Sequence, residues 1–347
     1  MHTHIKKECL VNIAINGLGR IGKSILRALY SRKDKHPQLV PLAINIGPAS
    51  LDQLVQSIRY DSIMGPLQES MLKITGNILS FGSWNIQIFQ ESAPEKLPWK
   101  ALAIDCVIEC SGIFTKREEA MRHQKAGAKK VIISAPAKNP DCTIIPGVNN
   151  HMYNPNQTII SSGSCTTNAI APLIKVIQSL TPITSIQLVT THAYTNSQHL
   201  VDTIPSQDAT DIRQFRAAGI NIIPGSTGAG KLMSEIFPEL KDKTSAIAIR
   251  VPVANVSLVQ VFWVGEQPIE KNTINQTFSH AEQSSLHGIL ATTNDPVVSS
   301  DFIGNPYSVT LDAPLTEAVG NHGRILGWYD NEWGYSNRII DFLQSIA

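Results

Sequence analysis

The first chemical feature of this chain is a cysteine within a run of small hydroxyl residues. Cys165 lies in the segment Ser161–Asn168, and the apolar positions of residues 169–177 follow it with helical spacing. We therefore expect Cys165 at a helix N-terminus, where unpaired backbone N–H groups and the positive dipole end favour a thiolate. An imidazolium from His192 would lower the pKa of this thiol further. The pattern indicates a nucleophilic cysteine, with a buried structural cysteine as the alternative.

The hydroxyl groups around this cysteine have two possible uses. Ser164, Thr166 and Thr167 could cap the expected helix, because side-chain oxygens accept hydrogen bonds from the N–H groups of a first helical turn. The same segment could bind an anion, since a helix N-terminus attracts negative charge.

A glycine motif near the start of the chain predicts a dinucleotide site. The run Gly17-Leu18-Gly19-Arg20-Ile21-Gly22 is G-x-G-x-x-G, and it joins an expected strand, Val11–Asn16, to an expected helix. In that context the glycines allow a tight turn and a close approach of a pyrophosphate to the helix N-terminus. The second strand ends at Ala43–Gly47 without the carboxylate expected to bind the adenosine ribose. Asn45 could accept a hydrogen bond there, and the choice between NAD and NADP stays open.

A second glycine run resembles a nucleotide-binding loop only in part. The segment Gly225–Lys231 fits G-x-x-x-x-G-K, but Leu232 stands where Ser or Thr would hold magnesium, and Pro224 is expected to interrupt the preceding strand. A nucleoside triphosphatase is therefore disfavoured. Binding of a smaller phosphate group or an ordinary turn remain as alternatives.

Composition narrows the class of protein. A chain of 347 residues is long enough for two domains, and 29 basic against 28 acidic residues argue against a nucleic-acid or membrane-surface partner. No apolar run is long enough to span a membrane, and the polar start does not fit a signal peptide. The odd cysteine count and scattered histidines indicate a reduced, cytoplasmic protein without a metal site; the cysteines are Cys9, Cys106, Cys110, Cys142 and Cys165.

The pattern of elements predicts two domains of different architecture. Alternating short strands and helices in the first half indicate a parallel sheet of Rossmann type, with two antiparallel strands added at 70–75 and 84–90. Longer alternating strands in the second half indicate an α+β domain with a mostly antiparallel sheet. We expect a dinucleotide-binding domain over residues 1–164, with a C-terminal helix, 335–347, packing back on it, and a catalytic domain over 165–334. The long, weakly patterned stretch Tyr194–Gly219 is expected to be a functional loop.

Several motifs in the same order resemble one family closely. The chain is similar over nearly its whole length to the phosphorylating glyceraldehyde-3-phosphate dehydrogenases and the related erythrose-4-phosphate dehydrogenases. The segments that carry the resemblance are 16–22, 126–131, 133–138, 164–168, 192–196, 222–228, 250–252 and 328–335.

The resemblance implies a mechanism and a cofactor. Cys165 would attack the aldehyde to form a thiohemiacetal, and His192 would activate the thiol and accept the hydroxyl proton as hydride leaves for NAD or NADP. Inorganic phosphate would then convert the thioester into an acyl phosphate. The residues implied to bind the cofactor are Asn16, Gly17, Gly19, Arg20, Ile21, Asn45, Ser111, Gly112, Ser134, Asn331 and Tyr335.

Two phosphate subsites are also implied. Thr195 and Arg250 match the subsite for the substrate phosphate. Residues matching the subsite for the attacking phosphate are Ser164, Thr166, Thr227, Gly228 and Arg216, with Arg213 nearby. Ser197 departs from the Asp or Thr of many relatives. The loop 202–212 is slightly longer than usual, and in this family it lies near the cofactor of a neighbouring subunit, the usual assembly being a homotetramer.

Alternatives to this assignment come from inside and outside the family. Segments 192–196 and 226–231 favour the triose phosphate, whereas 27–30 and 97–99 are closer to the erythrose-4-phosphate branch. The lack of a carboxylate to bind the adenosine ribose is the sole support for a non-catalytic binding protein on the same scaffold. The expected partners are a phosphorylated aldehyde and inorganic phosphate.

Overall fold

The computed structural model describes residues 10–207 and 209–346, which form two compact units. The first unit takes the chain through Ile144, His151–Gly163 and the residues from Ile339 onward; the second takes Ile145–Asn150 and Ser164–Arg338. They differ from the predicted ranges at 145–150, at Ser164 and at 335–338, which belong to the second unit. Cys9 lies outside the described residues.

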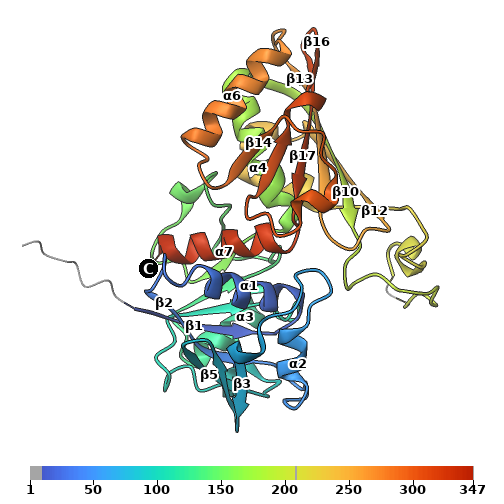
Figure 1. Cartoon of the computed structure of the whole chain (residues 1–347). Coiled ribbons are helices and arrows are strands. Elements are labelled where there is room, and N and C mark those ends of the chain that lie inside the picture. The colour runs from blue at the N-terminus through green and yellow to red at the C-terminus, as the bar shows by residue number, and fades with distance from the viewer. Residues whose placement is uncertain (1–9, 208, 347) are drawn as a thin grey trace, which may run out of the picture. The chain divides into compact units, whose positions relative to one another are not determined.

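The first unit is built on a largely parallel sheet with strand order β3-β4-β5-β2-β1-β6-β7-β9-β8 (Figure 1). Helices α1 and α3 are crossovers between parallel neighbours, joining β1 to β2 and β6 to β7. The elements are β1 Val11–Asn16, α1 Arg20–Ser31, β2 Leu39–Asn45, α2 Leu54–Arg59, β3 Leu72–Thr75, β4 Ile78–Phe81, β5 Trp84–Phe89, β6 Cys106–Glu109, α3 Arg117–Lys125, β7 Lys130–Ile133, β8 Cys142–Thr143 and β9 Ile159–Ser161.

One strand prediction in this unit was wrong. Segment 84–90 was expected to be antiparallel to the sheet, but β5 runs parallel to β2. The antiparallel contacts are those of β4 with β3 and β5, and β4 was not predicted. The chain reverses direction between β3 and β4 and again between β4 and β5, so β5 runs in the same direction as its neighbour β2.

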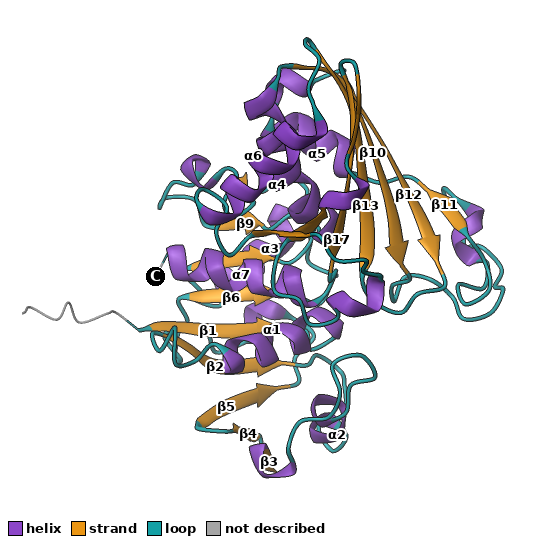
Figure 2. Cartoon of the chain, turned by 45° about the horizontal axis from the view of Figure 1, so that its top comes forward, coloured by secondary structure: helices purple, strands orange, loops and turns teal. Residues whose placement is uncertain are grey.

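The second unit contains a mostly antiparallel sheet with order β11-β12-β10-β13-β17-β15-β14, and β16 pairs with β17. Parallel pairing joins β10 to β12 and β14 to β15. Helices α4, α5 and α6 lie along one face of this sheet (Figure 2). The elements are α4 Cys165–Leu180, β10 Ile183–Ala193, β11 Ile223–Gly225, α5 Ala229–Ile236, β12 Thr244–Val251, β13 Ser257–Gly265, α6 Lys271–Gln283, β14 Leu290–Thr293, β15 Val309–Asp312, β16 Glu317–Val319 and β17 His322–Tyr329. Helix α7, Trp333–Ser345, begins in the second unit, and its residues from Ile339 onward belong to the first. The fold class is confirmed.

Single turns of 3₁₀ helix connect several of these elements. They are η1 Glu69–Met71, η2 Pro94–Lys96, η3 Asn150–Met152, η4 Ile212–Phe215, η5 Pro238–Leu240, η6 Ser299–Phe302 and η7 Ala313–Leu315. The loop expected over 194–219 forms, with η4 as its regular turn.

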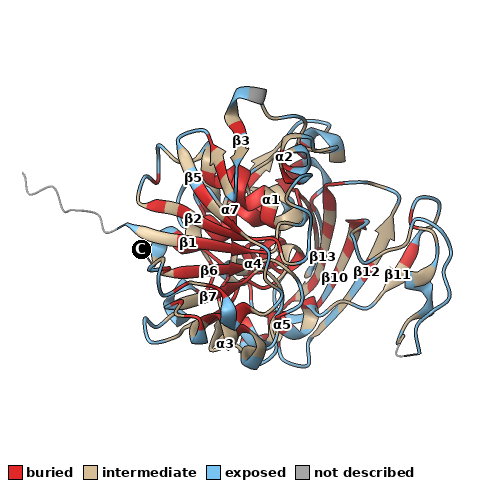
Figure 3. Cartoon of the chain, turned by 90° about the horizontal axis from the view of Figure 1, so that it is seen from below, coloured by how far each residue is buried: buried red, intermediate tan, exposed pale blue. Residues whose placement is uncertain are grey.

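Burial explains why the two halves of the sequence look different. Every position of β6 is buried, as in a parallel strand covered on both faces (Figure 3). Strand β13 instead alternates buried and half-buried positions, because one of its faces packs on helices. In the second unit, Leu173 and Ile177 of α4 share the core with Leu188 of β10 and Val259 of β13. Among residues 10–207 and 209–346, no helix is both long and apolar enough to cross a membrane.

Candidate active site

Cys165 is the first residue of α4, as the sequence predicts. Ser164 is the N-cap: its Oγ accepts a hydrogen bond from the Thr167 N–H at 3.1 Å, and its own N–H donates to Thr167 Oγ1 at 2.7 Å. This reciprocal cap confirms the capping role expected for Ser164 and Thr167, and it fixes the turn that carries the thiol.

His192 lies beside this cysteine. It is near the end of β10, and the Cys165 Sγ is 3.4 Å from its Nε2. Its Nδ1 is 2.7 Å from the carbonyl oxygen of Ala193. The contacts at Nδ1 admit two tautomers. With the proton on Nδ1, donated to that carbonyl, the Nε2 lone pair faces the thiol and suits a general base, whereas a hydrogen bond from Arg250 Nη1 to Nδ1 places the proton on Nε2.

Arg250 places a positive charge next to this pair. Parallel pairing of β10 with β12 sets Arg250 opposite His192. The Arg250 Nη1 lies 2.6 Å from His192 Nδ1 and donates to the Ala193 carbonyl at 3.1 Å. The structure therefore brings together three predicted residues from α4, β10 and β12.

Burial opposes the expected thiolate and imidazolium. Burial, with a smaller contribution from the Arg250 charge, lowers the pKa of His192 to about 4. Burial also raises the pKa of Cys165, although Arg250 and Thr166 act in the opposite direction. His192 is thus neutral at pH 7, and the nearby cation is Arg250. The sequence could not reveal this, because desolvation depends on tertiary packing.

Tyr329 is a neighbour that sequence reasoning missed. Its buried hydroxyl lies 3.1 Å from Thr166 Oγ1 and 2.8 Å from Thr190 Oγ1, and its ring packs edge-on against His192. Burial raises the pKa of Tyr329, so the phenol stays protonated. It joins the first turn of α4 to β10. A tyrosine ending an alternating strand gave no signal of this role beyond its place in the 328–335 motif.

Asn331 and Tyr335, both expected at the cofactor, are buried in the second unit. The Asn331 Oδ1 accepts a hydrogen bond from the Ser257 hydroxyl at 3.0 Å. The adjacent Asp330 carboxylate accepts hydrogen bonds from the N–H groups of Glu332 and Trp333. This cap explains why α7 begins before the predicted position 335.

The residues matched to the phosphate subsites form two groups: Thr195, Thr227 and Gly228 in one, and the two arginines of the long loop in the other. Thr195 Oγ1 lies 3.1 Å from the Ser197 hydroxyl, and Thr227 Oγ1 accepts a hydrogen bond from the Ala229 N–H before α5. Gly228 is the N-cap residue of α5.

Arg213 and Arg216 instead form ion pairs within the long loop. Arg213 binds both carboxylate oxygens of Asp211 at 2.9 Å, and Arg216 Nε lies 2.8 Å from Asp202. Both arginine side chains are exposed.

The second glycine run forms a strand, a turn and a helix. Pro224 lies within β11 rather than interrupting it, which corrects the expectation. An edge strand tolerates proline, because its N–H side needs no partner, and β11 is at the edge of its sheet. Lys231 is exposed and lies 4.0 Å from Glu235 on α5, as on an ordinary surface helix.

The glycine motif of the first unit has the geometry that close packing and anion binding require. Gly17 has φ +91°, and a Cβ there would stand 2.5 Å from the Ser111 nitrogen. A Cβ on Gly22 would stand 2.1 Å from the Gly17 oxygen, whereas one on Gly19 would meet no atom within 4 Å. Gly19 is also the N-cap of α1, without a side-chain cap. Two glycines therefore serve packing, and the third leaves the helix N-terminus open.

A cavity of about 320 Å³ adjoins Gly19 in the first unit. Its lining includes Leu18, Ile46, Ser50 and Gln53, and the part of the chain that the structure describes contributes no carboxylate to it. The open glycine, the uncapped helix and this cavity fit a dinucleotide.

Asn45, expected at the ribose, is hydrogen-bonded within the first unit. Its Nδ2 donates to Asn16 Oδ1 at 2.7 Å and to the Glu91 carbonyl, and its Oδ1 accepts from the Glu91 N–H at 3.0 Å. Because both ends of the buried amide are used, it holds the end of β2 to β1 and to the segment after β5. The sequence showed the residue type but not these partners.

Glu109, a buried carboxylate at the end of β6, organises the other expected cofactor residues. It accepts hydrogen bonds from Asn16 Nδ2 at 2.6 Å and from the N–H and hydroxyl of Ser111. Ser134 Oγ donates to its carbonyl, and His123 Nε2 lies 2.9 Å from its Oε2. Sequence reasoning missed Glu109; a charged residue ending a wholly apolar strand was the available signal.

The remaining predicted cofactor residues lie in the same unit. Arg20, at the start of α1, pairs with Asp61 at 2.5 Å. Ile21 is half-buried, and Gly112 has φ +74° with open space where its Cβ would be.

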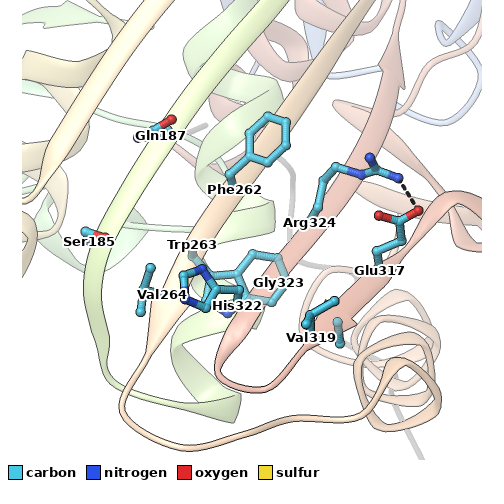
Figure 4. Close-up of a pocket in the computed structure, with 11 residues that line it drawn as sticks. Ser185, Gln187, Phe262, Trp263, Val264, Glu317, Val319, His322, Gly323 and Arg324 are labelled. Atoms are coloured by element: carbon cyan, nitrogen blue, oxygen red, sulfur yellow. Dashed lines mark ion pairs between the residues drawn. The ribbon is translucent and has the colours of Figure 1, made fainter.

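A further cavity, of about 370 Å³, lies in the second unit on strands β10, β13, β16 and β17 (Figure 4). Phe262, Trp263 and His322 line it beside the Glu317–Arg324 ion pair, and none of the predicted site residues does. In the described residues, no group of three or more His, Cys, Asp or Glu side chains could hold a metal ion.

Comparison with known proteins agrees with the geometry. Residues 11–117 match the model of the glyceraldehyde 3-phosphate dehydrogenase NAD-binding domain, and 164–331 match that of the C-terminal domain. The chain is 41% identical to glyceraldehyde-3-phosphate dehydrogenase of Geobacillus stearothermophilus over 339 residues, 97% of this chain and 98% of the relative. It is 40% identical to glyceraldehyde-3-phosphate dehydrogenase 2 of Trichormus variabilis, over 97% and 99% of the two chains. It is 41% identical to the chloroplastic A form of Zea mays, over 98% and 83%. The chain belongs to the glyceraldehyde 3-phosphate dehydrogenase family.

Proposed function

We propose that this chain oxidises glyceraldehyde 3-phosphate and captures the product with inorganic phosphate, using NAD or NADP and Cys165 as the nucleophile. The family and its full-length relatives support the activity. The single observation that supports this site is the 3.4 Å approach of the Cys165 Sγ to His192 Nε2, next to Arg250. This arrangement also opposes a non-catalytic scaffold, because it offers a nucleophile, a base and an anion-binding cation together.

The chemistry of each residue follows from its protonation. Neutral His192 accepts the thiol proton as Cys165 Sγ bonds to the aldehyde carbon, and it returns a proton to the oxygen to give a thiohemiacetal. His192 then takes the hydroxyl proton as the carbon loses hydride and becomes a thioester. The bound nicotinamide is the hydride acceptor. Attack by phosphate on the thioester carbon releases the thiol and forms an acyl phosphate, with the proton of His192 returning to sulfur.

Two groups of residues are proposed to hold the cofactor. In the first unit, the N-terminus of α1 behind Gly19, with Gly17, Arg20 and Ile21, would hold the pyrophosphate, since N–H groups there lack a side-chain cap. Ser111, Gly112 and Ser134 would line the cleft. In the second unit, Asn331 would hold the nicotinamide carboxamide, with its Oδ1 oriented by Ser257, and Tyr335 would lie near the ring.

The cavity beside Gly19, where we propose that the adenosine lies, supports use of both NAD and NADP. A carboxylate that binds ribose hydroxyls repels a 2′-phosphate, and the cavity beside Gly19 has none among its lining residues. The Asn45 amide is already hydrogen-bonded within the first unit. We therefore propose that the polar side chains of Ser50 and Gln53 bind the ribose. NADP should therefore be accepted without a like-charge penalty.

A homotetramer in the cytoplasm remains the proposed state of the protein. Large apolar side chains of the segment 200–222 are exposed, which supports contact with further copies of the chain; they are Leu200, Val201, Ile204, Ile212, Ile220 and Ile222. Free Cys106, Cys110, Cys142 and Cys165 support a reducing compartment.

The deciding experiment follows cofactor reduction with glyceraldehyde 3-phosphate and inorganic phosphate, supplying NAD and NADP in parallel. We expect turnover with both cofactors and its loss in Cys165→Ser, because the oxygen nucleophile lacks the acidity of the thiol. Cofactor binding by that variant should persist and serves as the control for folding. The proposal would be overturned if the wild type reduced neither cofactor, or if it preferred erythrose 4-phosphate under the same conditions.

A further inference from the structure

A buried carboxylate with no part in the proposed chemistry lies at the carboxyl end of β6. Glu109 is 1% exposed, and four polar groups contact its two oxygens. The N–H and the hydroxyl of Ser111 donate to Oε1. Asn16 Nδ2 donates to Oε2 at 2.6 Å, and His123 Nε2 lies 2.9 Å from the same oxygen. The question is what this arrangement holds in place.

The protonation of His123 follows from its second partner. Trp99 Nε1 lies 3.1 Å from His123 Nδ1, and an indole N–H can only donate. Nδ1 must therefore accept, so the single ring proton is on Nε2 and is donated to Glu109. Both rings are fully buried, so no water competes for these bonds. With four donors on two oxygens, Glu109 has no acceptor position left for a ligand, and any effect on function passes through the groups bonded to it.

The groups that Glu109 holds lie on both sides of the glycine turn. Asn16 immediately precedes Gly17, and a Cβ on Gly17 would stand 2.5 Å from the Ser111 nitrogen. The backbone adds one bond, from the Cys110 N–H to the Asn16 carbonyl at 2.7 Å. The carboxylate therefore joins the end of β1 to the turn after β6, at the close approach that Gly17 allows.

We propose that Glu109 and His123 are positioning residues of the dinucleotide site, which hold the glycine turn in the shape that receives the pyrophosphate. Trp99 sets the tautomer that makes His123 a donor. The inference rests on the proposed function, because it requires a dinucleotide at the N-terminus of α1. Without the His123 donor, a buried carboxylate oxygen loses a partner, which is costly. The carboxylate then turns away from Asn16 and Ser111, and cofactor affinity falls.

The test compares two replacements of His123 in the full-length protein. His123→Gln can keep both hydrogen bonds, because its amide oxygen accepts from Trp99 and its amide N–H donates to Glu109. His123→Leu fills the core without either bond. Calorimetric titration with NAD should give a dissociation constant at least about tenfold higher in His123→Leu, the scale of one hydrogen bond to a charged group, but within about threefold of the wild type in His123→Gln. At saturating NAD, kcat should stay within about twofold in both, because the reacting residues belong to the second unit.

A second measurement needs no cofactor. The Ser111 N–H is held by Glu109 Oε1 at 2.7 Å. In cofactor-free protein, hydrogen exchange of the peptide 109–113 should be faster in His123→Leu than in the wild type or in His123→Gln, because an amide exchanges when its hydrogen bond opens. A residue that only fills the core predicts the opposite order, since leucine is buried at lower cost than an amide.

A second variant and a matched control complete the experiment. Glu109→Gln keeps the shape of the side chain but turns an amide N–H toward donors on either side. It should raise the dissociation constant for NAD at least about tenfold, which keeps the test open even where His123→Leu does not fold. His36→Leu removes another buried histidine of the first unit, beyond the C-terminal end of α1 and 2.9 Å from Arg32, and should bind NAD as the wild type does.

The outcomes separate the inference from the function on which it rests. Equal affinities for NAD in His123→Leu and His123→Gln would refute the inference, as would a Glu109→Gln protein that binds NAD like the wild type. A fall in kcat with an unchanged dissociation constant would refute it as well. A wild type that does not bind NAD would instead refute the proposed function.

Discussion

At the scale of single residues, the environment of Cys165 decides how its chemistry starts. A helix N-terminus and a nearby histidine suggested a preformed thiolate, but burial dominates both groups. The neutral imidazole is a stronger base than an imidazolium, which has no lone pair to accept a proton. We therefore expect proton transfer during attack rather than a resting ion pair.

The pH dependence of alkylation tests this charge state. In cofactor-free protein, the pKa of Cys165 lies above its ordinary value of 9.0, so the thiolate fraction and the alkylation rate should rise about tenfold per pH unit between pH 6 and 8. Iodoacetamide labelling followed by peptide mass analysis measures it. A rate that is already at its plateau near pH 6 would show a thiolate–imidazolium pair instead.

Comparison among cysteines provides the control for that measurement. Burial raises the pKa of Cys106 and of Cys110 to about 12, and that of Cys142 to about 11. None of the three has a histidine partner like that of Cys165 in the described structure. Cys165 should be labelled first at every pH.

At the scale of elements, the site depends on how α4 is held against β10. The Ser164–Thr167 cap shapes the first turn of α4, and Tyr329 links Thr166 to Thr190. The register of β10 with β12 then sets Arg250 beside His192. Each contact is local, but together they join parts of the chain far apart in sequence.

Tyr329→Phe tests this link. Removing the hydroxyl leaves Thr166 and Thr190 without their shared partner and should cost about 1–2 kcal/mol of unfolding free energy, the usual range for a buried hydrogen bond. We expect a lower kcat with little change in KM for either phosphate, because the substrate contacts remain. Urea unfolding and steady-state kinetics measure the two effects.

The two measurements distinguish positioning from mere stability. Ser179→Ala, which removes a hydroxyl bonded to its own helix at the far end of α4, should leave kcat unchanged. A Tyr329→Phe enzyme that is destabilised but has wild-type kcat would limit Tyr329 to a structural role.

At the scale of the whole molecule, the segment 200–222 carries several exposed large apolar side chains. Leu200 and Ile204 are 87% and 93% exposed. Exposed large apolar side chains on one segment favour an interface. Because Arg213 and Arg216 lie on the same segment, assembly and the active-site loop are expected to be coupled.

Mass measurement tests the assembly. We expect the wild-type protein to behave as a tetramer in light scattering, and Leu200→Asp with Ile204→Asp to give smaller species, because charges in an apolar interface are costly. Val298→Asp, at an exposed apolar position elsewhere, should leave the mass unchanged. A monomeric wild type, or an unchanged mass in the double variant, would contradict the proposed interface.

The sequence by itself determined the fold class, the glycine turn and the cysteine at a helix start. These depend on local periodicity and on residue types with few alternatives, such as glycine at a φ of +91°. The residues that we propose for catalysis and cofactor binding were likewise recognisable from motifs, since each motif is contiguous.

Only the tertiary structure decided the partners of the polar side chains, the protonation of His192 and the direction of strand β5. In the structure β5 is parallel to β2, and the Asn45 amide is hydrogen-bonded to its neighbours. Arg213 and Arg216 form ion pairs with carboxylates, and the lowered pKa of His192 leaves its side chain neutral. The structure also revealed the hydrogen bonds of Glu109 and Tyr329. Each of these features depends on contacts between distant segments and on the water excluded by packing, neither of which a local pattern of residues records.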